Sequence, residues 1–197
     1  VSANPEGAVR TGTIGTLVPE TAAKVISEDG TSLPRHESGE LCIKGPQVML
    51  GYWQRPEETD KVLDEDGWLR TGDMAVMLDD GYLKIVDRKK DMISVSGFKV
   101  FPNEVEDVAS LHPNVLECAA IGVVDEHSGE AVKLVVVPSD KTLTADELIA
   151  FCKERLTAYK VPKNIVFRTE LPKSNVGKIL RREIREREAA ETGQQNS

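Results

Sequence analysis

The segment 82–106 constrains the fold most, because one pattern of residues ends there and a different one begins. Apolar residues between Tyr82 and Val86 are typical of a β-strand, and they stop at the five consecutive charged residues 87–91. An alternating apolar pattern resumes at Ile93 and is interrupted at Ser96-Gly97. A charge run of this kind is most often solvated surface, but the change of pattern on its two sides indicates a hinge between two bodies.

Residues 1–86 have the pattern of short strands separated by turn signals, and they contain little helix. Asp79-Asp80-Gly81 lies between two apolar runs and predicts a β-hairpin. The expected strands cover residues 14–18, 23–26, 40–44, 76–78 and 83–85. We therefore expect a small β-barrel or the rim of a larger sheet, with too little helix for a complete nucleotide-binding α/β domain.

Residues 92–188 mix helix and strand, and we predict a compact α+β domain there. Thr144 and Glu147 form a capping box that begins one helix, and the run 131–137 is apolar enough to be a central strand. The other expected elements are helices at 103–111 and 178–187 and strands at 117–124 and 165–168. The predicted fold class is α+β overall, with a hinge at 87–91. Residues 189–197 are polar and lack apolar anchors, so we expect a disordered tail.

The net charge of −8 argues against general nucleic-acid binding, which needs a basic surface. The charge is unevenly distributed, since residues 163–187 contain eight basic side chains and three acidic ones. A late basic segment on an acidic protein indicates either attraction of one anionic ligand, such as a nucleotide phosphate, or an exposed basic helix. Charge alone leaves both interpretations open.

Three further observations limit the class of protein. No apolar run approaches the roughly 20 residues of a membrane span, and no basic-then-apolar leader opens the chain. Cys42, Cys118 and Cys152 are widely spaced among apolar neighbours, which predicts buried, reduced thiols of a cytosolic protein and no metal ligands. The first residue is Val1 and the opening residues have a loop composition, so we expect the chain to begin inside a longer protein.

Three residues are suited to binding a nucleotide. Asp73 follows a glycine, so its carboxylate can approach a ligand and accept hydrogen bonds from the two hydroxyls of a ribose. Arg88 offers planar, multidentate contact to phosphate or ribose oxygens. Lys178 follows Gly177 where a flexible loop meets the expected helix, and it could offset charge that develops on a phosphoryl or acyl oxygen. Each signal is weak alone, because Gly-Asp turns and exposed lysines are common.

Taken together, four segments resemble the signatures of the adenylate-forming (AMP-binding) enzyme superfamily. They are residues 39–53, 66–73, 85–91 and 171–178, and the resemblance extends to about Arg187. Within the superfamily the sequence is most similar to the bacterial long-chain fatty acid–CoA ligases. The resemblance implies that the first 86 residues are the β-rich end of a large AMP-binding domain, and that residues 92–188 are its mobile carboxy-terminal domain.

The resemblance implies a two-step reaction with a fatty acid, ATP and coenzyme A (CoA). The fatty carboxylate attacks the α-phosphate of ATP to give acyl-AMP and pyrophosphate, and the CoA thiol then displaces AMP. Asp73 would hold the ribose hydroxyls, Arg88 would contact the same ribose, and Lys178, the catalytic residue, would bridge the acyl carboxylate and the phosphate oxygens. Lys90 matches the hinge position, within a charged joint kept in water.

The resemblance also assigns the loop used in the second step. Ser96, Gly97 and Lys99 match the residues that guide CoA. A glycine is suited to that place, because a narrow pantetheine tunnel leaves no room for a side chain. The family's carboxy-terminal domain turns about the hinge, so the Lys178 loop is expected to serve the first step and the Ser96–Lys99 loop the second.

This chain departs from the family in two ways. Ser94, Lys99 and Phe101 stand where Leu, Asn and Tyr are expected, and Lys99 adds a charge beside the proposed CoA path. The phosphate loop rich in Ser, Thr and Gly, and the glutamate segment that holds Mg²⁺, do not appear in the sequence. We therefore expect the Mg²⁺ site and most of the acyl pocket to lie outside this chain, and no turnover from the chain alone.

Two other interpretations stay open. The first keeps the superfamily but changes the acid, as in an aryl-CoA ligase or another adenylation domain, because the acid-selecting residues lie mostly outside the chain. The second is a non-catalytic module that docks an anionic partner or membrane surface through Lys163–Arg187. The ligase interpretation predicts a cytoplasmic protein without a nucleic-acid partner, and peripheral association with the inner face of the membrane is a further expectation.

Overall fold

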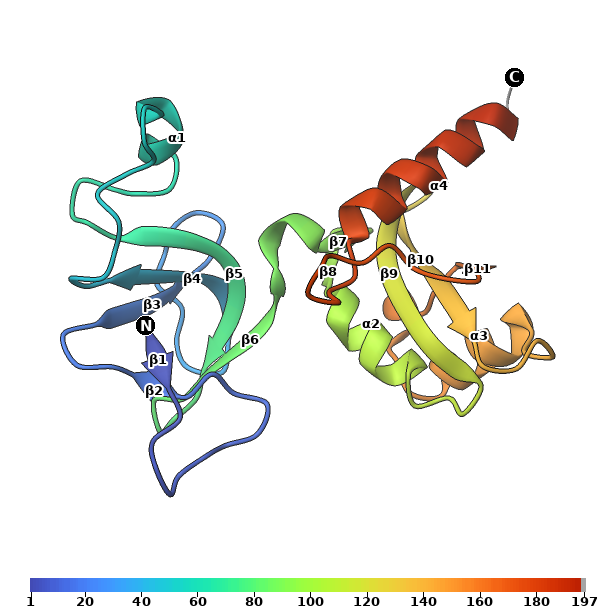
Figure 1. Ribbon diagram of the computed structural model, residues 1–197, viewed down its shortest axis with the longest axis horizontal. Helices are drawn as coiled ribbons and strands as arrows, with labels where there is room; N and C mark the ends of the chain where they lie inside the picture. The colour runs from blue at the N-terminus through green and yellow to red at the C-terminus, as the bar shows by residue number, and fades with distance from the viewer. Residues whose placement is uncertain (196–197) are drawn as a thin grey trace. The chain divides into compact units, whose positions relative to one another are not determined.

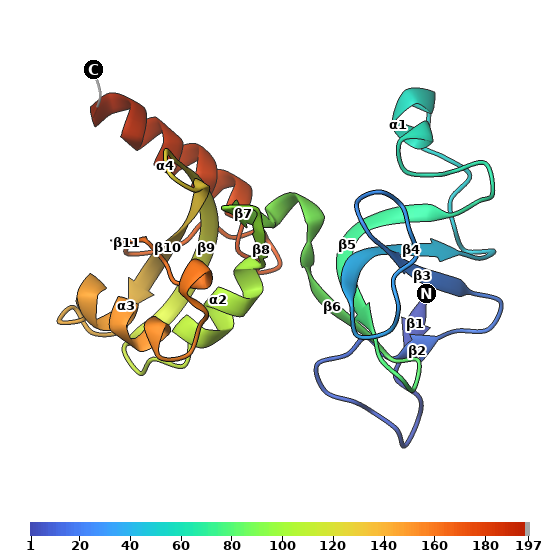
Figure 2. The same ribbon diagram turned by 180° about the vertical axis from the view of Figure 1, so that it is seen from behind.

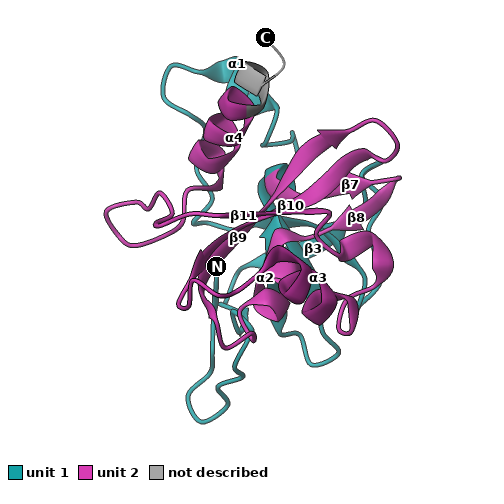
Figure 3. Cartoon of the chain, turned by 90° about the vertical axis from the view of Figure 1, so that its right-hand side faces the viewer, with its two compact units in different colours: residues 1–90 teal, residues 91–197 magenta. Residues whose placement is uncertain are grey.

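The structure, a computed structural model, describes the backbone of residues 1–195 and the side chains of residues 1–191. The chain divides into two units, residues 1–90 (unit 1) and 91–197 (unit 2), which Figure 3 distinguishes by colour. The division falls within the charged segment 87–91. Each unit has hydrophobic clusters of its own.

Unit 1 is built on a four-stranded antiparallel sheet in the order β3-β4-β5-β6 (Figure 1). Its core consists of Leu41, Ile43, Ala75 and Leu83. The four strands are β3 (Ala22–Ile26), β4 (Ser38–Lys44), β5 (Leu69–Met77) and β6 (Leu83–Arg88). A two-stranded sheet of β1 (Ser2–Ala3) and β2 (Thr16–Leu17) and the short helix α1 (Pro56–Asp60) complete the unit.

The predicted hairpin at Asp79-Asp80-Gly81 is confirmed, because β5 and β6 pair on its two sides. The predicted barrel is not found. The strands β3 and β6 are the two ends of an open sheet, and the structure shows no pairing between them. Side-chain-filled barrels usually have about five to eight strands, and the four strands described here are too few to surround a core.

Unit 2 contains a mixed sheet with helices on both faces (Figure 1; Figure 2). Strand β10 (Gly129–Pro138) pairs with β9 (Val115–Asp125) along one side, and with β7 (Ile93–Val95) and β11 (Asn164–Phe167) along the other. The predicted central position of this strand is confirmed. The remaining elements are η1 (Lys89–Asp91, which spans the division), β8 (Phe98–Val100), α2 (Pro102–Ala109), α3 (Ala145–Lys153), η2 (Ala158–Lys160) and α4 (Arg181–Gln195).

The alternation of side chains along β10 explains the two-sided core. Val132, Leu134 and Val136 pack in a cluster with residues of α2 and α3, whereas Val135 and Val137 pack with Ile184 of α4. Successive residues of a strand point to opposite faces, so one apolar strand supplies both layers. The predicted cap of α3 is also confirmed, since Thr144 Oγ1 accepts a hydrogen bond from the Glu147 amide at 3.2 Å.

Helix α4 differs from the prediction at both ends. It begins at Arg181 rather than at residue 178, and it continues to Gln195 where a disordered tail was expected. The missing apolar anchor is replaced by ion pairs, because the buried Glu188 contacts Lys133 and Arg168. Alanines and Arg–Glu pairs four residues apart also favour a helix here. The prediction for residues 196 and 197 lies outside the described residues.

Two expectations concern the class of protein. The three cysteines are buried and free of disulfides, and burial raises the pKa of the Cys118 thiol to about 11. Such a thiol is a poor nucleophile at neutral pH, which agrees with the structural role predicted for it. Within residues 1–195, no helix combines the length and apolar content that crossing a membrane requires.

Candidate nucleotide- and CoA-binding site

Asp73 and Arg88 form an ion pair on neighbouring strands. The antiparallel register of β5 and β6 places the two residues opposite each other, and Arg88 Nε lies 2.8 Å from Asp73 Oδ1. The Asp73 amide donates a hydrogen bond to Thr71 Oγ1 at 3.1 Å, and that hydroxyl donates to the Leu41 carbonyl at 2.8 Å. The carboxylate is therefore held by its own sheet, while the Arg88 side chain is 58% exposed. A donor and an acceptor stand side by side at the surface of unit 1.

The charged segment 87–91 is not simply kept in water, and this corrects the expectation from the sequence. Asp87 and Asp91 are 2% and 8% exposed. Lys89 pairs with Glu40 of unit 1 at 2.9 Å, and Asp91 pairs with Arg185 of unit 2 at 2.8 Å. Lys90 lies between these two paired residues and is exposed. Opposite charges brought by distant elements therefore offset the repulsion that the sequence pattern predicted.

Ser96 and Gly97 form the two-residue turn of the β7–β8 hairpin. Their φ angles are 51° and 83°, and two consecutive positive values are typical of a type I′ turn. The Ser96 amide donates to the Ser128 carbonyl at 2.8 Å, and Phe98 stacks on Tyr159 with ring centroids 4.8 Å apart. A Cβ on Gly97 would meet no atom within 4 Å. The local reason for this glycine is therefore its backbone conformation. Lys99 follows on β8, opposite Ser94 and exposed.

Lys178 lies in a closed hairpin loop rather than at a helix start. Lys173 and Ile179 form an isolated antiparallel bridge, the Ser174 amide donates to the Lys178 carbonyl at 2.8 Å, and Gly177 has a φ of 78°. These bonds keep residues 178–180 extended, which explains why α4 begins only at Arg181. The sequence predicts a flexible loop, and the structure shows that residues 173–180 are joined by hydrogen bonds, with the Lys178 side chain exposed.

The basic side chains of segment 163–187 are almost all paired with carboxylates. The partners are Asp125 for Lys163, Glu188 for Arg168, Glu117 for Lys173, Glu106 for Arg181, Glu186 for Arg182, Asp91 for Arg185 and Glu183 for Arg187. Among the described residues, Lys178 is the one base of this segment without a carboxylate at ion-pair distance. The local excess of positive charge is therefore concentrated on one ammonium group.

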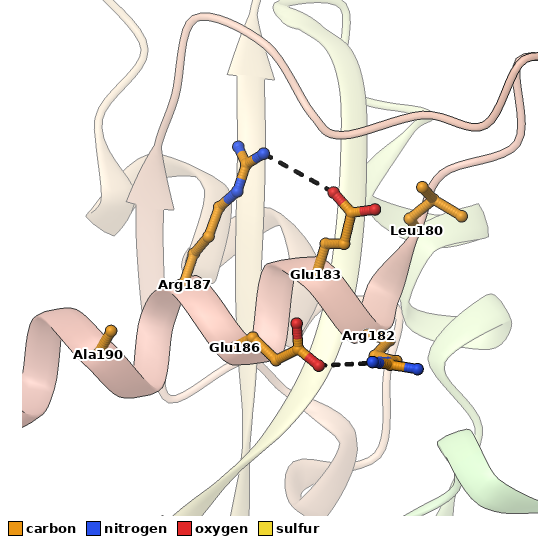
Figure 4. A pocket seen from close by; sticks show the side chains of 6 residues that line it. All are labelled: Leu180, Arg182, Glu183, Glu186, Arg187 and Ala190. Atoms are coloured by element: carbon orange, nitrogen blue, oxygen red, sulfur yellow. Dashed lines mark hydrogen bonds and ion pairs between the residues drawn. The ribbon is translucent and has the colours of Figure 1, made fainter.

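An open groove of about 790 Å³ runs along α4, as Figure 4 shows. It is lined by Leu180, Arg182, Glu183, Glu186, Arg187 and Ala190. Arg182 pairs with Glu186 at 2.8 Å and Arg187 with Glu183 at 3.7 Å, so the charged residues of the lining balance each other. This groove offers no attraction for an anionic ligand, and we assign none to it.

The structure brings some predicted site residues together and keeps others apart. Asp73 and Arg88 pair within unit 1, whereas Ser96, Gly97 and Lys178 belong to unit 2. Within unit 2, the β7–β8 turn and the loop before α4 project on opposite sides (Figure 3). In the described part of the chain, no group of three or more His, Cys, Asp or Glu residues could hold a metal ion.

The sequence analysis did not identify the buried carboxylate of Glu40 and the partly buried carboxylate of Glu106, which hold these segments. Glu40 forms an ion pair with Lys89, and Glu106 forms one with Arg181. A signal existed for Glu40, which stands in the otherwise apolar strand pattern of β4, where a charged residue is expected to have a partner. Nothing in the sequence pairs Glu106 with Arg181, because 75 residues separate them.

This geometry agrees with the comparisons with known proteins. The chain belongs to the AMP-binding enzymes: residues 1–53 match the AMP-binding enzyme family, and residues 104–178 match the AMP-binding enzyme C-terminal domain. Over 187 residues it is 61% identical to the long-chain-fatty-acid–CoA ligase of Salmonella typhimurium, covering 94% of this chain and 33% of that protein. The resemblance seen in the sequence is thus confirmed.

Two more distant relatives show how far the similarity extends. The chain is 46% identical over 168 residues to the feruloyl-CoA synthase of Amycolatopsis, covering 85% of this chain and 34% of that protein. The ATP-bound crystal structure of MatB from Rhodopseudomonas palustris is 35% identical with a TM-score of 0.88, and the match covers 94% of this chain and 37% of that one. This chain spans about one third of the length of the curated relatives it matches.

Proposed function

We propose that this chain is the carboxy-terminal part of an AMP-forming long-chain fatty acid–CoA ligase. In the first step a fatty carboxylate oxygen bonds to the α-phosphorus of ATP, and the bond to pyrophosphate breaks. In the second step the sulfur of CoA bonds to the acyl carbon, and AMP leaves with the electrons of the C–O bond. The higher identity to a fatty acid ligase than to a feruloyl-CoA synthase, 61% against 46%, supports a fatty acid as the substrate.

The observation that carries the proposal is the isolation of the Lys178 ammonium. A module that docks an anionic surface would need several unpaired bases, but seven of the eight in segment 163–187 lie at ion-pair distance from a carboxylate. One exposed ammonium on a hydrogen-bonded loop is instead suited to contacting a single anionic group. It can approach a phosphate and offset the negative charge that develops when the acyl carboxylate attacks.

The pair of Asp73 and Arg88 fits a ribose. Arg88 pairs with Asp73 Oδ1, so the second oxygen of the carboxylate, Oδ2, can accept a hydrogen bond from a ribose hydroxyl. The exposed guanidinium of Arg88 is a hydrogen-bond donor beside it. We assign both residues to the nucleotide. The Mg²⁺ ion that such a reaction uses is expected outside this chain, and we assign no residue here to it.

The β7–β8 turn is proposed to guide CoA in the second step. Ser96 and Gly97 present backbone groups at its tip, and Lys99 adds a positive charge on the following strand. The turn and the Lys178 loop project on opposite sides of unit 2, which supports the proposal that each step uses a different face (Figure 3). Rotation about Lys90 would exchange the two faces. The cytoplasmic location and the peripheral membrane association remain predictions from the sequence.

The experiment that tests the function joins this chain to the preceding two thirds of the Salmonella typhimurium ligase. We expect the fusion to form palmitoyl-CoA from palmitate, ATP and CoA, and the 197-residue chain alone to release no AMP. Lys178→Ala is expected to slow pyrophosphate exchange by about 100- to 1,000-fold and to spare thioester formation from supplied palmitoyl-AMP. Lys141→Ala, which removes another exposed lysine of unit 2, is the matched control. Equal loss in both steps, or none, would contradict the proposed role of Lys178.

A further inference from the structure

Arg181 is the first residue of α4 and follows Lys178 by three positions. Its guanidinium makes a two-point contact with Glu106 of α2, with Nε 2.9 Å from Oε1 and Nη2 2.6 Å from Oε2. The same Nη2 lies 2.5 Å from Asn103 Oδ1. The side chains of Arg181 and Glu106 are only 18% and 16% exposed. A two-point contact of this kind fixes direction as well as distance.

Glu106 is itself fixed by the sheet. Its Oε1 accepts a hydrogen bond from the backbone amide of Ala120 in β9 at 2.8 Å, and Ala120 is fully buried. The carboxylate therefore connects the start of α4 to both α2 and β9. Both elements contribute buried residues to the larger hydrophobic cluster of unit 2, so Arg181 is attached to that core.

The Lys178 loop has few other attachments. At its beginning, Leu171 is buried against α4 and the sheet, and Lys173 pairs with Glu117. Its internal hydrogen bonds join only residues of the loop itself. At its end, the contacts of Arg181 hold the chain where the loop passes into α4. Ile179 is partly buried and packs against the same cluster as Leu171. Because the Lys178 ammonium has no carboxylate partner, its place in unit 2 depends on the packing of Ile179 and on these two ends.

We propose that Arg181 and Glu106 are positioning residues for Lys178, and that their contact fixes the loop for the adenylation step. The proposal rests on the proposed function of Lys178. It excludes a role for Arg181 as a ligand of the nucleotide itself. It also predicts selectivity: loss of the contact displaces the Lys178 loop, while the β7–β8 turn, which is attached through Ser128 and Tyr159, stays in place.

The first experiment measures the loop directly and needs no catalytic activity. Hydrogen exchange of the Ser174 and Leu180 amides, which bond across the base of the loop, is compared in the 197-residue chain and its Arg181→Lys variant. Lysine keeps the charge but loses the two-point contact, so we expect exchange of these amides to rise about tenfold, with β9 and β10 unaffected. Glu106→Gln, which keeps an acceptor for the Ala120 amide, is expected to act in the same direction.

Two matched variants serve as controls. Arg182→Lys changes the neighbouring arginine, which pairs with Glu186 on the exposed side of the same helix. Arg168→Lys loosens the later part of α4, where Arg168 contacts Glu188. Both are expected to leave the Ser174 and Leu180 amides unchanged. Unchanged exchange in Arg181→Lys, or a rise spread evenly over unit 2, would overturn the proposal.

The second experiment uses the fusion with the Salmonella typhimurium ligase and separates the two half-reactions. In the Arg181→Lys variant we expect kcat of pyrophosphate exchange to fall about 100-fold, with little change in the KM for ATP. The reason is that a misplaced catalytic group slows the reaction without weakening the binding of the substrate. Thioester formation from supplied palmitoyl-AMP is expected to be unchanged. An equal fall in both half-reactions would show a merely structural role. An inactive unmodified fusion would count against the proposed function, while hydrogen exchange would still decide the anchoring.

Discussion

Asp73 and Arg88 lie opposite each other on antiparallel strands, with Arg88 Nε 2.8 Å from Asp73 Oδ1. The two residues that the sequence indicates as separate nucleotide ligands therefore form one donor–acceptor pair. The pair is only partly buried, so its contribution to folding is small, and a ligand can still reach it. Its position on the sheet fixes where the ribose of the proposed nucleotide would bind in unit 1.

Asp73→Asn in the fused enzyme is expected to raise the KM for ATP by about 10- to 100-fold, because a charge-assisted hydrogen bond to the ribose is lost. The free energy of unfolding is expected to change by less than about 1 kcal/mol, since the partner Arg88 is largely exposed. Pyrophosphate exchange at varied ATP concentration measures the first effect and urea denaturation the second. Asp80→Asn, at the exposed pair with Arg10, is the control and leaves the KM unchanged.

Gly97→Ala and Gly177→Ala form a reciprocal test of the two loops. Both glycines have positive φ, 83° and 78°, and a Cβ at either meets no atom within 4 Å. Each substitution is therefore expected to cost about 1 kcal/mol of backbone strain without a clash within the chain. We expect Gly97→Ala to slow thioester formation selectively and Gly177→Ala to slow pyrophosphate exchange selectively. If both variants slowed the same half-reaction, the assignment of one loop to each step would be wrong.

Glu188 is expected to make the stability of unit 2 depend on pH. Burial opposes its ionisation, but hydrogen bonds from Lys133 and Arg168 outweigh this and hold its pKa below the ordinary value of 4.5. Its stabilising contribution is present above pH 4.5 and is lost as the pH falls through the lower pKa of the folded state. Glu188→Gln is therefore expected to destabilise the chain by about 3 kcal/mol at pH 7, because it leaves Lys133 without its charged partner.

The measurement is urea denaturation of the parent chain and the Glu188→Gln variant between pH 7 and pH 3. The difference between them is expected to begin to shrink as the pH falls below 4.5, and to be lost below the lower pKa of the folded state, where protonated Glu188 in the parent resembles glutamine. Glu186→Gln, at an exposed pair with Arg182, is expected to differ little from the parent at any pH. A difference for Glu188→Gln that stays constant over this range would contradict the role of its charge.

Periodic apolar patterns predicted most of the strands and helices, because the side chains that those elements bury in the core recur at the period of a strand or a helix. The strand 131–137 is apolar on both faces and does lie in the centre of its sheet. The extension of α4 to Gln195 could not be predicted in this way. Its anchor is the buried charge of Glu188, and the bases that neutralise it lie 55 and 20 positions earlier in the chain, at Lys133 and Arg168.

The candidate site shows the same limit. Asp73, Arg88 and Lys178 are predicted as site residues from short motifs that resemble the signatures of the family. Their partners were not found, because the register of β5 and β6 and the contact between Glu106 and Arg181 arise only in the folded chain. Local sequence thus identified the groups proposed to meet the substrates, while the groups that hold them in place required the structure.

Lys90 is the one residue between Lys89, which is paired with Glu40, and Asp91, which is paired with Arg185. One residue therefore separates the last ion pair of unit 1 from the first ion pair of unit 2. A substitution at Lys90 leaves both ion pairs intact, so the chemical nature of this position can vary without releasing either end of the link.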